Sequence, residues 1–428
     1  MSKKSQDDDL NIWVIEPHQP LIFRDGRPFN LKPGVIAQSL PFPFPSTTTG
    51  GVRTQAGLNQ EGIFDHTSEK QLEALKNLKV RGPLLVQLHA NEDDYEKQQE
   101  EPIDWFMPAP ADALLLKPDK KSSSEAKALL KRLVPIEETP EILTDLTDIC
   151  QEEKIEPSLQ LVGMHPWISG KPIAGSPRYW KWHTFKEWLL HPEEKEIATW
   201  DELGIMGLQQ EERVHVRMDG ENHKGKDGAL FATRGMEFVT RNDGEGLQAA
   251  RILALAVIVD KGAQLAPQPG FSTLGGERRI VYWQNYTSRS ISCPPELIEK
   301  IVVHEGSWSC RMILLTPASF KGGFYPKKIQ EPQDGVTPIL KAIAIQRPEV
   351  ISGWDFTKNE KGRTGAPKKT RRLAPAGTVL YLELKGERDN IQRWVERYWL
   401  ECISDEVQDC NDGFGLAVIG TWDTNNKR

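Results

Sequence analysis

Five short segments of the sequence place arginines or lysines beside residues that turn or loosen the backbone. The first, Phe23–Phe29, reads FRDGRPF, so Arg24 and Arg27 flank the dipeptide Asp25-Gly26. Asp-Gly is a strong turn former, and two arginines on either side of it would project from the turn together. An anion-binding turn and a plain hairpin with solvated arginines explain this pattern about equally well.

Hydroxyl side chains dominate the second segment, Pro45–Arg53. Its candidate binding residues are Ser46, Thr47, Thr48, Gly50 and Arg53. A loop of this composition can offer backbone N–H groups and hydroxyl donors to phosphate oxygens. A helix cap explains Ser46 and the threonines about as well. The segment therefore predicts either a phosphate-binding loop or the start of a helix.

Two consecutive arginines follow two glycines in the third segment, Leu274–Ile280. The glycines are Gly275 and Gly276, and the arginines are Arg278 and Arg279. If a strand begins here, the two arginine side chains point to opposite faces of it. At most one of them can then lie in a given groove, unless the backbone is bulged.

The fourth and fifth segments lie in the C-terminal part of the chain. The basic run from Lys361 to Arg372 contains no acidic residue, and its cations are Lys361, Arg363, Lys368, Lys369, Arg371 and Arg372. A solvated loop is the alternative interpretation of that run. Gly413 and Gly415 lie where a helix gives way to a strand, so another backbone could approach closely there. A tight helix–strand connection explains these glycines equally well.

No segment predicts a catalytic centre, a metal site or a cofactor. The sequence lacks GxxxxGK[ST], HExxH, GxSxG and the kinase signatures, and its nine histidines are scattered. His18 follows a predicted strand and could act as a general acid or base, but no second catalytic group is placed beside it. We therefore expect no enzymatic activity.

Composition favours a globular protein with a local binding surface. The 428 residues include 54 Lys and Arg against 61 Asp and Glu, a net charge of −7, so any nucleic-acid contact must come from a local basic patch. The longest apolar run, Ile252–Val259, is far shorter than the roughly 20 residues that span a membrane. The N-terminus lacks the apolar region of a secretory signal, and the five cysteines form no CxxC pair. We expect a reduced, cytoplasmic protein.

The elements of the C-terminal half follow the order β-α-β-β-α-β. The expected strands are 280–283, 312–315, 378–384 and a final strand that follows a glycine-rich turn within 412–420, and the expected helices are 294–302 and 391–402. The last helix has the clearest apolar periodicity of the chain. This order is the ferredoxin-like unit. The insertion of about sixty residues inside it, Pro317–Ala376, is long for a structureless loop and carries the basic run.

The N-terminal half is less regular. Strands are expected at 10–15 and 84–88 with a helix around 72–78, further helices at 122–133 and 179–190, and a hairpin from 215–218 and 230–239. A polar stretch at 242–250 predicts the domain boundary. The expected domains are residues 1–245 and 246–428, the second with the basic insertion 317–376.

Together the five segments could surround one extended strand of nucleic acid. Recognition of single-stranded RNA uses phosphate contacts, splayed bases and stacking on aromatic side chains. Each phosphate contact would contribute about −0.7 to the slope of log affinity against log salt concentration.

The ordered set of motifs resembles the third subunits of Cmr complexes, the type III-B CRISPR effectors, which belong to the RAMP superfamily. The motifs are FRDGRPF, PFPFPSTTTGGVRT, LGGERRIVYW, ISGWDF, KKTRRLAPAGTVLYLELKG and GFGLAVIGTW. The resemblance extends from about Asn11 to Trp422 and is least diagnostic between about residues 91 and 210.

The resemblance implies an α+β fold with two ferredoxin-like, RRM-related βαββαβ domains and long insertions. It also implies a non-catalytic subunit that caps the base of the complex and holds the 5′ handle, the repeat-derived end of the CRISPR RNA. The subunit would link the large polymerase/cyclase-like subunit to the backbone RAMP subunits. Gly413 and Gly415 would form the RAMP glycine-rich loop. The handle-facing cations would be Arg24, Arg27, Arg53, Arg278, Arg279 and the segment Lys368–Arg372.

Two alternatives stay open. Some RAMP proteins cleave precursor CRISPR RNA without a metal, and in such an endoribonuclease His18 would be the least implausible acid–base group. The chain could also be a protein scaffold whose basic insertion docks an acidic partner and touches no RNA.

Overall fold

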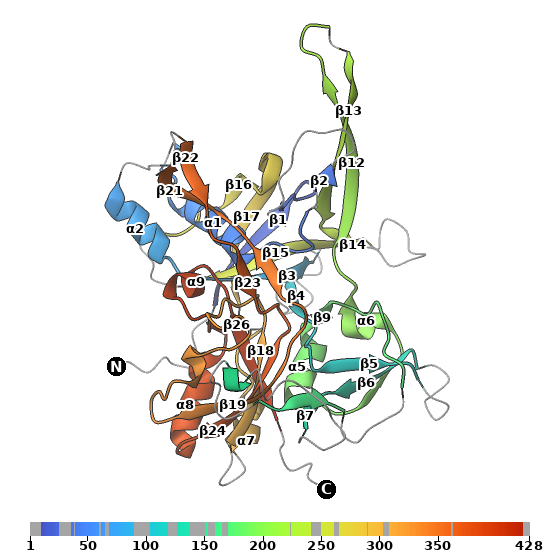
Figure 1. Cartoon of the computed structure of the whole chain (residues 1–428), viewed down its shortest axis with the longest axis vertical. Helices are drawn as coiled ribbons and strands as arrows, with labels where there is room; N and C mark the ends of the chain where they lie inside the picture. Colours follow the sequence, from blue (N-terminus) through green and yellow to red (C-terminus); the bar gives the residue numbers. More distant parts are fainter. Residues whose placement is uncertain are drawn as a thin grey trace. The chain divides into compact units, whose positions relative to one another are not determined.

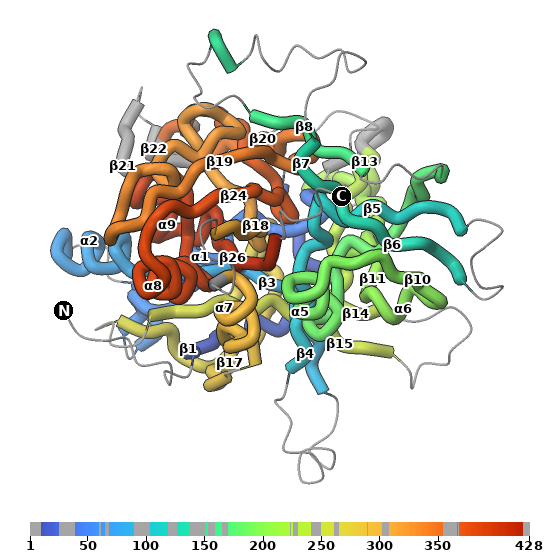
Figure 2. Tube along the Cα trace, turned by 90° about the horizontal axis from the view of Figure 1, so that it is seen from below, coloured from blue at the N-terminus to red at the C-terminus, as the bar shows by residue number. Residues whose placement is uncertain are grey.

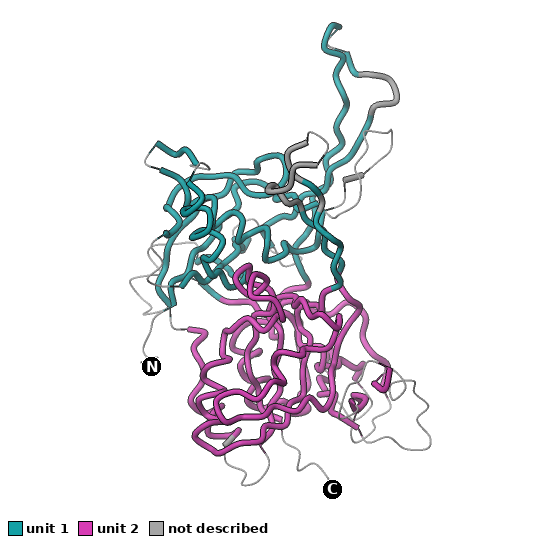
Figure 3. Tube along the Cα trace, turned by 60° about the vertical axis from the view of Figure 1, so that its left-hand side comes forward, with its two compact units in different colours: residues 1–104, 207–288, 350–372 teal, residues 105–206, 289–349, 373–428 magenta. Residues whose placement is uncertain are grey.

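In the computed structural model the chain forms two compact units, each assembled from three separate segments of the sequence (Figure 3). Unit 1 contains residues 1–104, 207–288 and 350–372, and unit 2 contains residues 105–206, 289–349 and 373–428. Because the units are interleaved along the chain, neither coincides with residues 1–245 or 246–428. The structure describes residues 10–24, 36–37, 39–59, 61–64, 68–89, 103–118, 126–136, 150–152, 159–164, 170–222, 224–240, 250–260, 265–288, 290–302, 308–360 and 363–422.

An antiparallel sheet forms the centre of unit 1, with the strand order β3-β15-β1-β17-β16 (Figure 1). Its strands are β1 (Leu10–Pro17), β3 (Val80–Leu88), β15 (Arg251–Val259), β16 (Gly270–Leu274) and β17 (Arg279–Ser288), and the short β14 (Val239–Thr240) pairs with β15. The apolar run from Leu253 to Val259 lies in β15 and is buried along its whole length. A strand with partners on both sides and cover on both faces explains this unbroken apolar run.

The hydroxyl-rich segment after β1 is a helix and not a loop. Helix α1 (Pro45–Ala56) begins with Pro45 in its first turn, and α2 (Glu69–Asn77) follows it. Gly51 lets α1 lie close against the sheet, since a Cβ there would be 2.9 Å from Leu274 Cδ1 and 3.3 Å from Trp283 Cζ2. The segment does begin a helix, but the N-cap residue is Phe44 and no side chain caps the helix, so Ser46 and the threonines are not its cap. Phosphate binding by this segment stays a prediction.

Unit 1 has the strand order of a ferredoxin-like sheet but only one of its two helical connections. Strands β1 and β3 flank β15, with α1 in the connection between them, and β17 lies beside β1. The described residues between β15 and β17 contain β16 and no α-helix. A complete ferredoxin-like domain is therefore not confirmed here.

A long two-stranded hairpin projects from the rest of unit 1 (Figure 1). It consists of β12 (Gln209–Met218) and β13 (Gly225–Glu237), with Val216 opposite Leu230, and β2 (Ile36–Ala37) pairs with β13 in parallel. The predicted hairpin is thus confirmed, and it is longer than expected.

The main sheet of unit 2 has the order β19-β24-β18-β26-β25 and is antiparallel throughout. Its strands are β18 (Trp308–Leu314), β19 (Thr337–Ala344), β24 (Val379–Lys385), β25 (Glu401–Cys402) and β26 (Leu416–Thr421). The helices α5 (Trp182–Leu190), α7 (Pro295–Val302) and α8 (Arg388–Tyr398) contact it, and α7 contacts both of the others (Figure 2). The short α9 (Val407–Asn411) precedes β26.

The sequence-based ferredoxin-like order is corrected at its first strand. Residues 280–283 do form a strand, but they belong to β17 and pair with β1 and β16 in unit 1. In unit 2 the connection from β18 to β19 contains the 3-10 helix η3 (Lys328–Gln330) and no α-helix. The chain therefore has a mixed α/β fold with several small, mostly antiparallel sheets, and two complete ferredoxin-like domains are not confirmed.

Shorter strands complete unit 2. Strands β4 (Ile103–Pro108), β9 (Tyr179–Lys181) and β11 (Gly204–Ile205) pair in the order β4-β9-β11 at one end of a nine-stranded sheet, and α6 (Trp200–Leu203) precedes β11. Two small sheets contain β5 (Ala113–Leu116), β6 (Ala128–Arg132) and β10 (Lys195–Ile197), and β7 (Val134–Ile136) with β8 (Leu161–Gly163). The predicted helix at 122–133 is wrong over 128–132, which form β6. A short apolar run does not distinguish a buried strand from a helix.

The insertion from 317 to 376 is not structureless. It contains η3 and β19, followed by β20 (Glu349–Ile351), β21 (Trp354–Glu360), β22 (Arg363–Pro367) and β23 (Arg371–Leu373). Strands β21 and β22 form a hairpin that lies in unit 1. The described part of the basic run, residues 363–372, thus contains β22 and the start of β23.

A buried ion pair ties the small sheets of unit 2 to its main sheet. Arg311 in β18 and Asp112 just before β5 are both fully buried, with Nη1 and Oδ2 2.5 Å apart. Arg311 also donates to the carbonyls of Trp188, at 2.6 Å, and Thr421, at 2.7 Å, and Trp188 Nε1 donates to Asp112 Oδ1 at 3.1 Å. Burial, followed by the Asp112 charge, raises the pKa of Tyr381 well above its ordinary value, so this phenol stays neutral and donates to Asp112. The buried charges are therefore paired and hydrogen-bonded.

All five cysteines lie among the described residues and carry free thiols. Within the same described part of the chain, none of the helices combines the length and the apolarity that crossing a membrane requires.

Candidate nucleic-acid interface

The loop between β16 and β17 is held tightly against the chain that follows β1. Gly275 has a φ of 76°, and a Cβ at this position would lie 2.7 Å from the carbonyl oxygen of Ile22. The N–H of Gly276 donates to the same oxygen at 2.7 Å. The close backbone approach therefore requires glycine at position 275, whereas a Cβ on Gly276 would lie 3.3 Å from the same oxygen.

The two arginines of this loop have different environments, although only Arg279 lies on a strand and the predicted alternation does not apply to Arg278. Arg279 is only 9% exposed, and its Nη2 lies 2.6 Å from Glu277 Oε2. Arg278 is exposed. Glu277 and Arg278 both have positive φ values, 58° and 50°, which are uncommon for residues with a side chain. The loop is therefore bent so that one arginine supports it and the other faces solvent.

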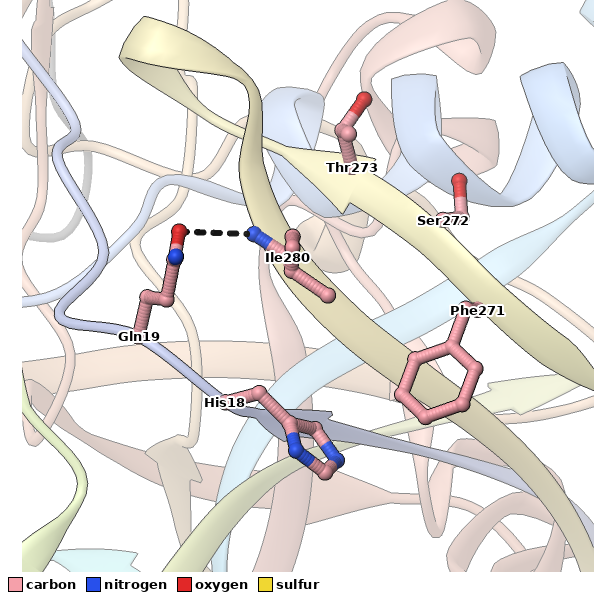
Figure 4. Close-up of a pocket in the computed structure, with 6 residues that line it drawn as sticks. All are labelled: His18, Gln19, Phe271, Ser272, Thr273 and Ile280. Carbon is pink, nitrogen blue, oxygen red and sulfur yellow. Dashed lines mark hydrogen bonds between the residues drawn. The ribbon is translucent and has the colours of Figure 1, made fainter.

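An open pocket lies next to this loop, on the same hairpin. It has a volume of about 510 Å³ and is lined by His18, Gln19, Phe271, Ser272, Thr273 and Ile280 (Figure 4). The N–H of His18 donates to the Ile280 carbonyl at 3.0 Å, and Gln19 Oε1 accepts from the Ile280 N–H at 3.4 Å. These two bonds fix the end of β1 to β17 at the pocket.

Two aromatic rings that line this pocket, those of His18 and Phe271, lie close to a third, that of Tyr282. The ring centroids of Phe271 and Tyr282 are 4.8 Å apart, and the His18 centroid lies 5.2 Å from Phe271 and 6.5 Å from Tyr282. Phe271 is 69% exposed, although it lies in a strand. Sequence reasoning missed Phe271 and Tyr282, because only the pairing of β16 with β17 places them directly opposite each other.

The first cationic turn is only partly described. Arg24 is exposed, and its backbone pairs with that of Ser39 in an isolated antiparallel β-bridge. Gly26 and Arg27 lie outside the described residues.

The residues of α1 are mostly used within the fold. Thr48 is fully buried, and its hydroxyl donates to the Pro45 carbonyl at 3.1 Å. Arg53 Nη2 donates to the carbonyls of Lys76, at 2.9 Å, and Leu78, at 3.2 Å, which lie at the C-terminal end of α2. Ser46 and Thr47 are half-buried, and Gly50 is exposed. The guanidinium group of Arg53 thus binds the carbonyls at a helix end, and its contact with RNA stays a prediction.

The described cations of the basic run lie in β22, in β23 and in the segment between them. Lys368, Lys369 and Arg372 are exposed, and Arg371 is half-buried. The backbone of Lys368 is fixed by its N–H bond to the Gly353 carbonyl at 2.7 Å. Arg363 lies in β22, whereas Lys361 falls outside the described residues.

The glycine-rich turn before β26 is buried in unit 2. The N–H groups of Gly413, Phe414 and Gly415 donate to the carbonyls of Cys410, Asp409 and Pro317. A Cβ on Gly415, whose φ is 81°, would lie 2.9 Å from the Ser404 nitrogen. The geometry supports the tight helix–strand connection at Gly413 and Gly415. Contact of these glycines with RNA stays a prediction that the geometry does not support.

Acid–base and metal chemistry gain no support from the geometry. His18 Nε2 lies 4.0 Å from Glu16 Oε1, beyond hydrogen-bond distance. Across the part of the chain that the structure describes, no group of three or more His, Cys, Asp or Glu side chains could hold a metal ion.

A family model for CRISPR-associated proteins, Cas_Cmr3, matches residues 13–422. The chain belongs to this family. The match covers nearly the whole sequence and confirms the resemblance to the third subunit of type III-B Cmr complexes that the ordered motifs indicated. No curated protein matches the sequence.

Two solved structures contain chains of similar extent. One is the cryo-EM structure of the type III-B Cmr-beta bound to cognate target RNA, with 14% sequence identity, a TM-score of 0.41 and coverage of 86% of each chain. The other is the same type of complex bound to cognate target RNA and AMPPnP, in state 1, with 14% identity, a TM-score of 0.39 and coverage of 90% of this chain and 88% of that chain. These similarities are too low to locate a binding site.

Proposed function

We propose that this member of the Cas_Cmr3 family is a non-catalytic, RNA-binding subunit of a type III-B CRISPR effector complex. It caps the base of the complex and holds the 5′ handle of the CRISPR RNA. It also joins the large polymerase/cyclase-like subunit to the backbone of RAMP subunits. Family membership supports a place in the complex, and the cations of unit 1 support contact with RNA.

One observation carries the RNA-binding part of the proposal. In the β16–β17 loop, two glycines and an internal ion pair hold the backbone in place, and Arg278 is presented to solvent. An arginine on a rigid loop binds a phosphate at low entropic cost, because its backbone is already ordered. The other described exposed cations from the predicted set, Arg24, Lys368, Lys369 and Arg372, lie in the same unit.

The decisive experiment replaces Arg278 in the full chain and measures RNA retention by the assembled complex. We expect Arg278→Glu to weaken binding of handle-bearing RNA about 10-fold, since it removes one charge-assisted contact and adds repulsion. Arg388→Glu, at the exposed start of α8 in unit 2, is the matched control and should leave binding unchanged. Equal affinities for the two variants would overturn the role of this loop.

The endoribonuclease alternative is tested directly. Incubation of the purified chain with labelled repeat RNA should leave the RNA intact, because no second acid–base group lies within hydrogen-bond distance of His18 in the described part of the chain. Cleavage that is lost in His18→Ala would reject the non-catalytic proposal.

A further inference from the structure

The sheet face of unit 1 that carries His18, Phe271 and Tyr282 is unusual for the amount of aromatic surface that it exposes. Phe271 lies opposite Tyr282 in the register of β16 and β17, and Thr273 lies opposite Ile280. Side chains alternate between the two faces of a strand, so these four residues share one face. Leu274, Val281 and Trp283 lie on the other face and are buried.

The sheet face that carries Phe271 and Ile280 is exposed to solvent, and polar residues would normally be expected at such positions. Several of its residues are apolar instead. Phe271 is 69% exposed and Ile280 is 41% exposed, while His18 packs edge-on against Phe271. Exposed aromatic residues that cluster beside a pocket indicate a binding surface and not a contribution to the core.

The groups around the rings fit a ligand with two parts. One is a flat, uncharged ring with hydrogen-bonding edges, and the other is a negatively charged group attached to it. Gln19 and Thr273 line the same pocket and can bond to polar ring edges. Arg278 lies two residues before Ile280, at the tip of the hairpin, and is exposed. Of the nearby carboxylates, Glu277 is paired with Arg279, and Glu16 lies 4.0 Å from His18.

We propose that His18, Phe271 and Tyr282 form a stacking platform for an unpaired nucleobase of single-stranded RNA. Arg278 would hold a phosphate of the same strand, while Gln19 and Thr273 would contact the edge of the base. Aromatic side chains on a sheet face stack bases without strong sequence preference, because every base has a π-face. This inference rests on the proposed RNA-binding function.

An apolar peptide is the competing occupant of such a surface. The aromatic character of the patch, its small extent and the adjacent exposed arginine all favour a base with its phosphate. The two occupants give different results in the following test.

The test uses the full chain in the assembled complex and RNA with 2-aminopurine at single positions. One set of RNAs carries the probe in the handle of the guide, and the other carries it in the target strand. We expect strong quenching at one handle position, lost in Phe271→Ala and kept in Phe271→Tyr. Affinity for handle-bearing RNA should fall about 5-fold to 100-fold in Phe271→Ala and stay near wild type in Phe271→Tyr. Quenching in the target strand instead would support the platform and assign it to that strand.

Three results would overturn the platform. The first is unchanged quenching and affinity in a folded Phe271→Ala variant. The second is an equal loss in Phe271→Ala and Phe271→Tyr. The third is unchanged RNA affinity in Phe271→Ala with loss of another subunit from the complex, which would assign the surface to protein binding. In each case, weakened binding by Arg278→Glu would show that the proposed RNA-binding function itself still holds.

Discussion

The guanidinium group of Arg279 lies 2.6 Å from the carboxylate of Glu277, two residues earlier in the same hairpin loop. This contact uses one arginine of a consecutive pair to fix the loop. The other arginine, Arg278, is exposed in a left-handed backbone conformation. The pair therefore divides into a supporting residue and a residue presented to a ligand, and the variants below separate these roles.

Arg278→Gly should separate stability from binding. The φ of Arg278 is 50°, where an L-residue pays about 1–2 kcal/mol that glycine avoids, while glycine loses about 0.5–1 kcal/mol through its flexibility. We expect the free energy of unfolding, measured by urea denaturation, to change by less than about 1 kcal/mol. RNA retention by the complex should also fall, but less than in Arg278→Glu, because glycine removes the contact without adding repulsion. A large loss of stability would show that Arg278 also supports the fold.

Gly275→Ala should disrupt the same loop. An added Cβ would lie 2.7 Å from the Ile22 carbonyl oxygen, a backbone atom that cannot move aside easily. We expect a loss of about 2–3 kcal/mol in unfolding free energy and weaker RNA binding. Gly323→Ala is the matched control, because Gly323 has a nearly identical φ of 77° and no atom within 4 Å of its Cβ position. Equal losses in the two variants would mean that backbone conformation alone, and not the approach to Ile22, requires Gly275.

Salt dependence should distinguish the cation from the aromatic platform. Arg278→Gln removes about one phosphate contact, so the slope of log affinity against log salt concentration should become less negative by about 0.7. Phe271→Ala should weaken binding without changing that slope, because stacking releases no counterions. Titrations at four or five salt concentrations measure both slopes. A changed slope in Phe271→Ala alone would contradict the assignment of the two residues.

Removing one partner of the buried Arg311–Asp112 ion pair in unit 2 should lower the unfolding free energy strongly. Replacing both partners should lower it less than the two single changes together. Asp112→Ala leaves Arg311 charged and fully buried, which typically costs about 3–5 kcal/mol. Arg311→Met should cost a similar amount. The double variant should lose less unfolding free energy than the two single variants lose in total, because no unpaired buried charge remains. Urea denaturation of the four proteins measures this cycle, and strict additivity would show that the two side chains are not coupled.

The predictable part of the fold was the part with clear periodicity. The apolar spacing around Ile391 and Trp394 correctly predicts α8, and the alternation in Val379–Leu384 correctly predicts β24. Strand 280–283 was also predicted, but its partners were not, because strand pairing depends on contacts far apart in the sequence. For the same reason, the sequence did not predict that each compact unit combines three separate segments of the chain.

In the candidate site, too, only some features could be predicted from the sequence. The sequence argument placed Arg278 and Arg279 on opposite faces of a strand, but β17 begins at Arg279, and Arg278 lies before it with a φ of 50°. The different exposure of the two arginines therefore comes from the bent loop and not from strand alternation. The contact of Arg53 with the end of α2 could not be predicted, because its partners are backbone carbonyls more than twenty residues away. Phe271 and Tyr282 were missed because each is an ordinary strand residue until the register brings the rings together.

Photocrosslinking of the assembled complex tests the central claim most directly. Guide RNA with a photoreactive nucleotide at each handle position is crosslinked, and the modified peptides of this chain are identified by mass spectrometry. Adducts should concentrate in the peptide from Phe271 to Tyr282, which contains both Arg278 and the platform. Adducts confined to other parts of the chain, or none on this chain at all, would contradict the claim that this hairpin holds the RNA.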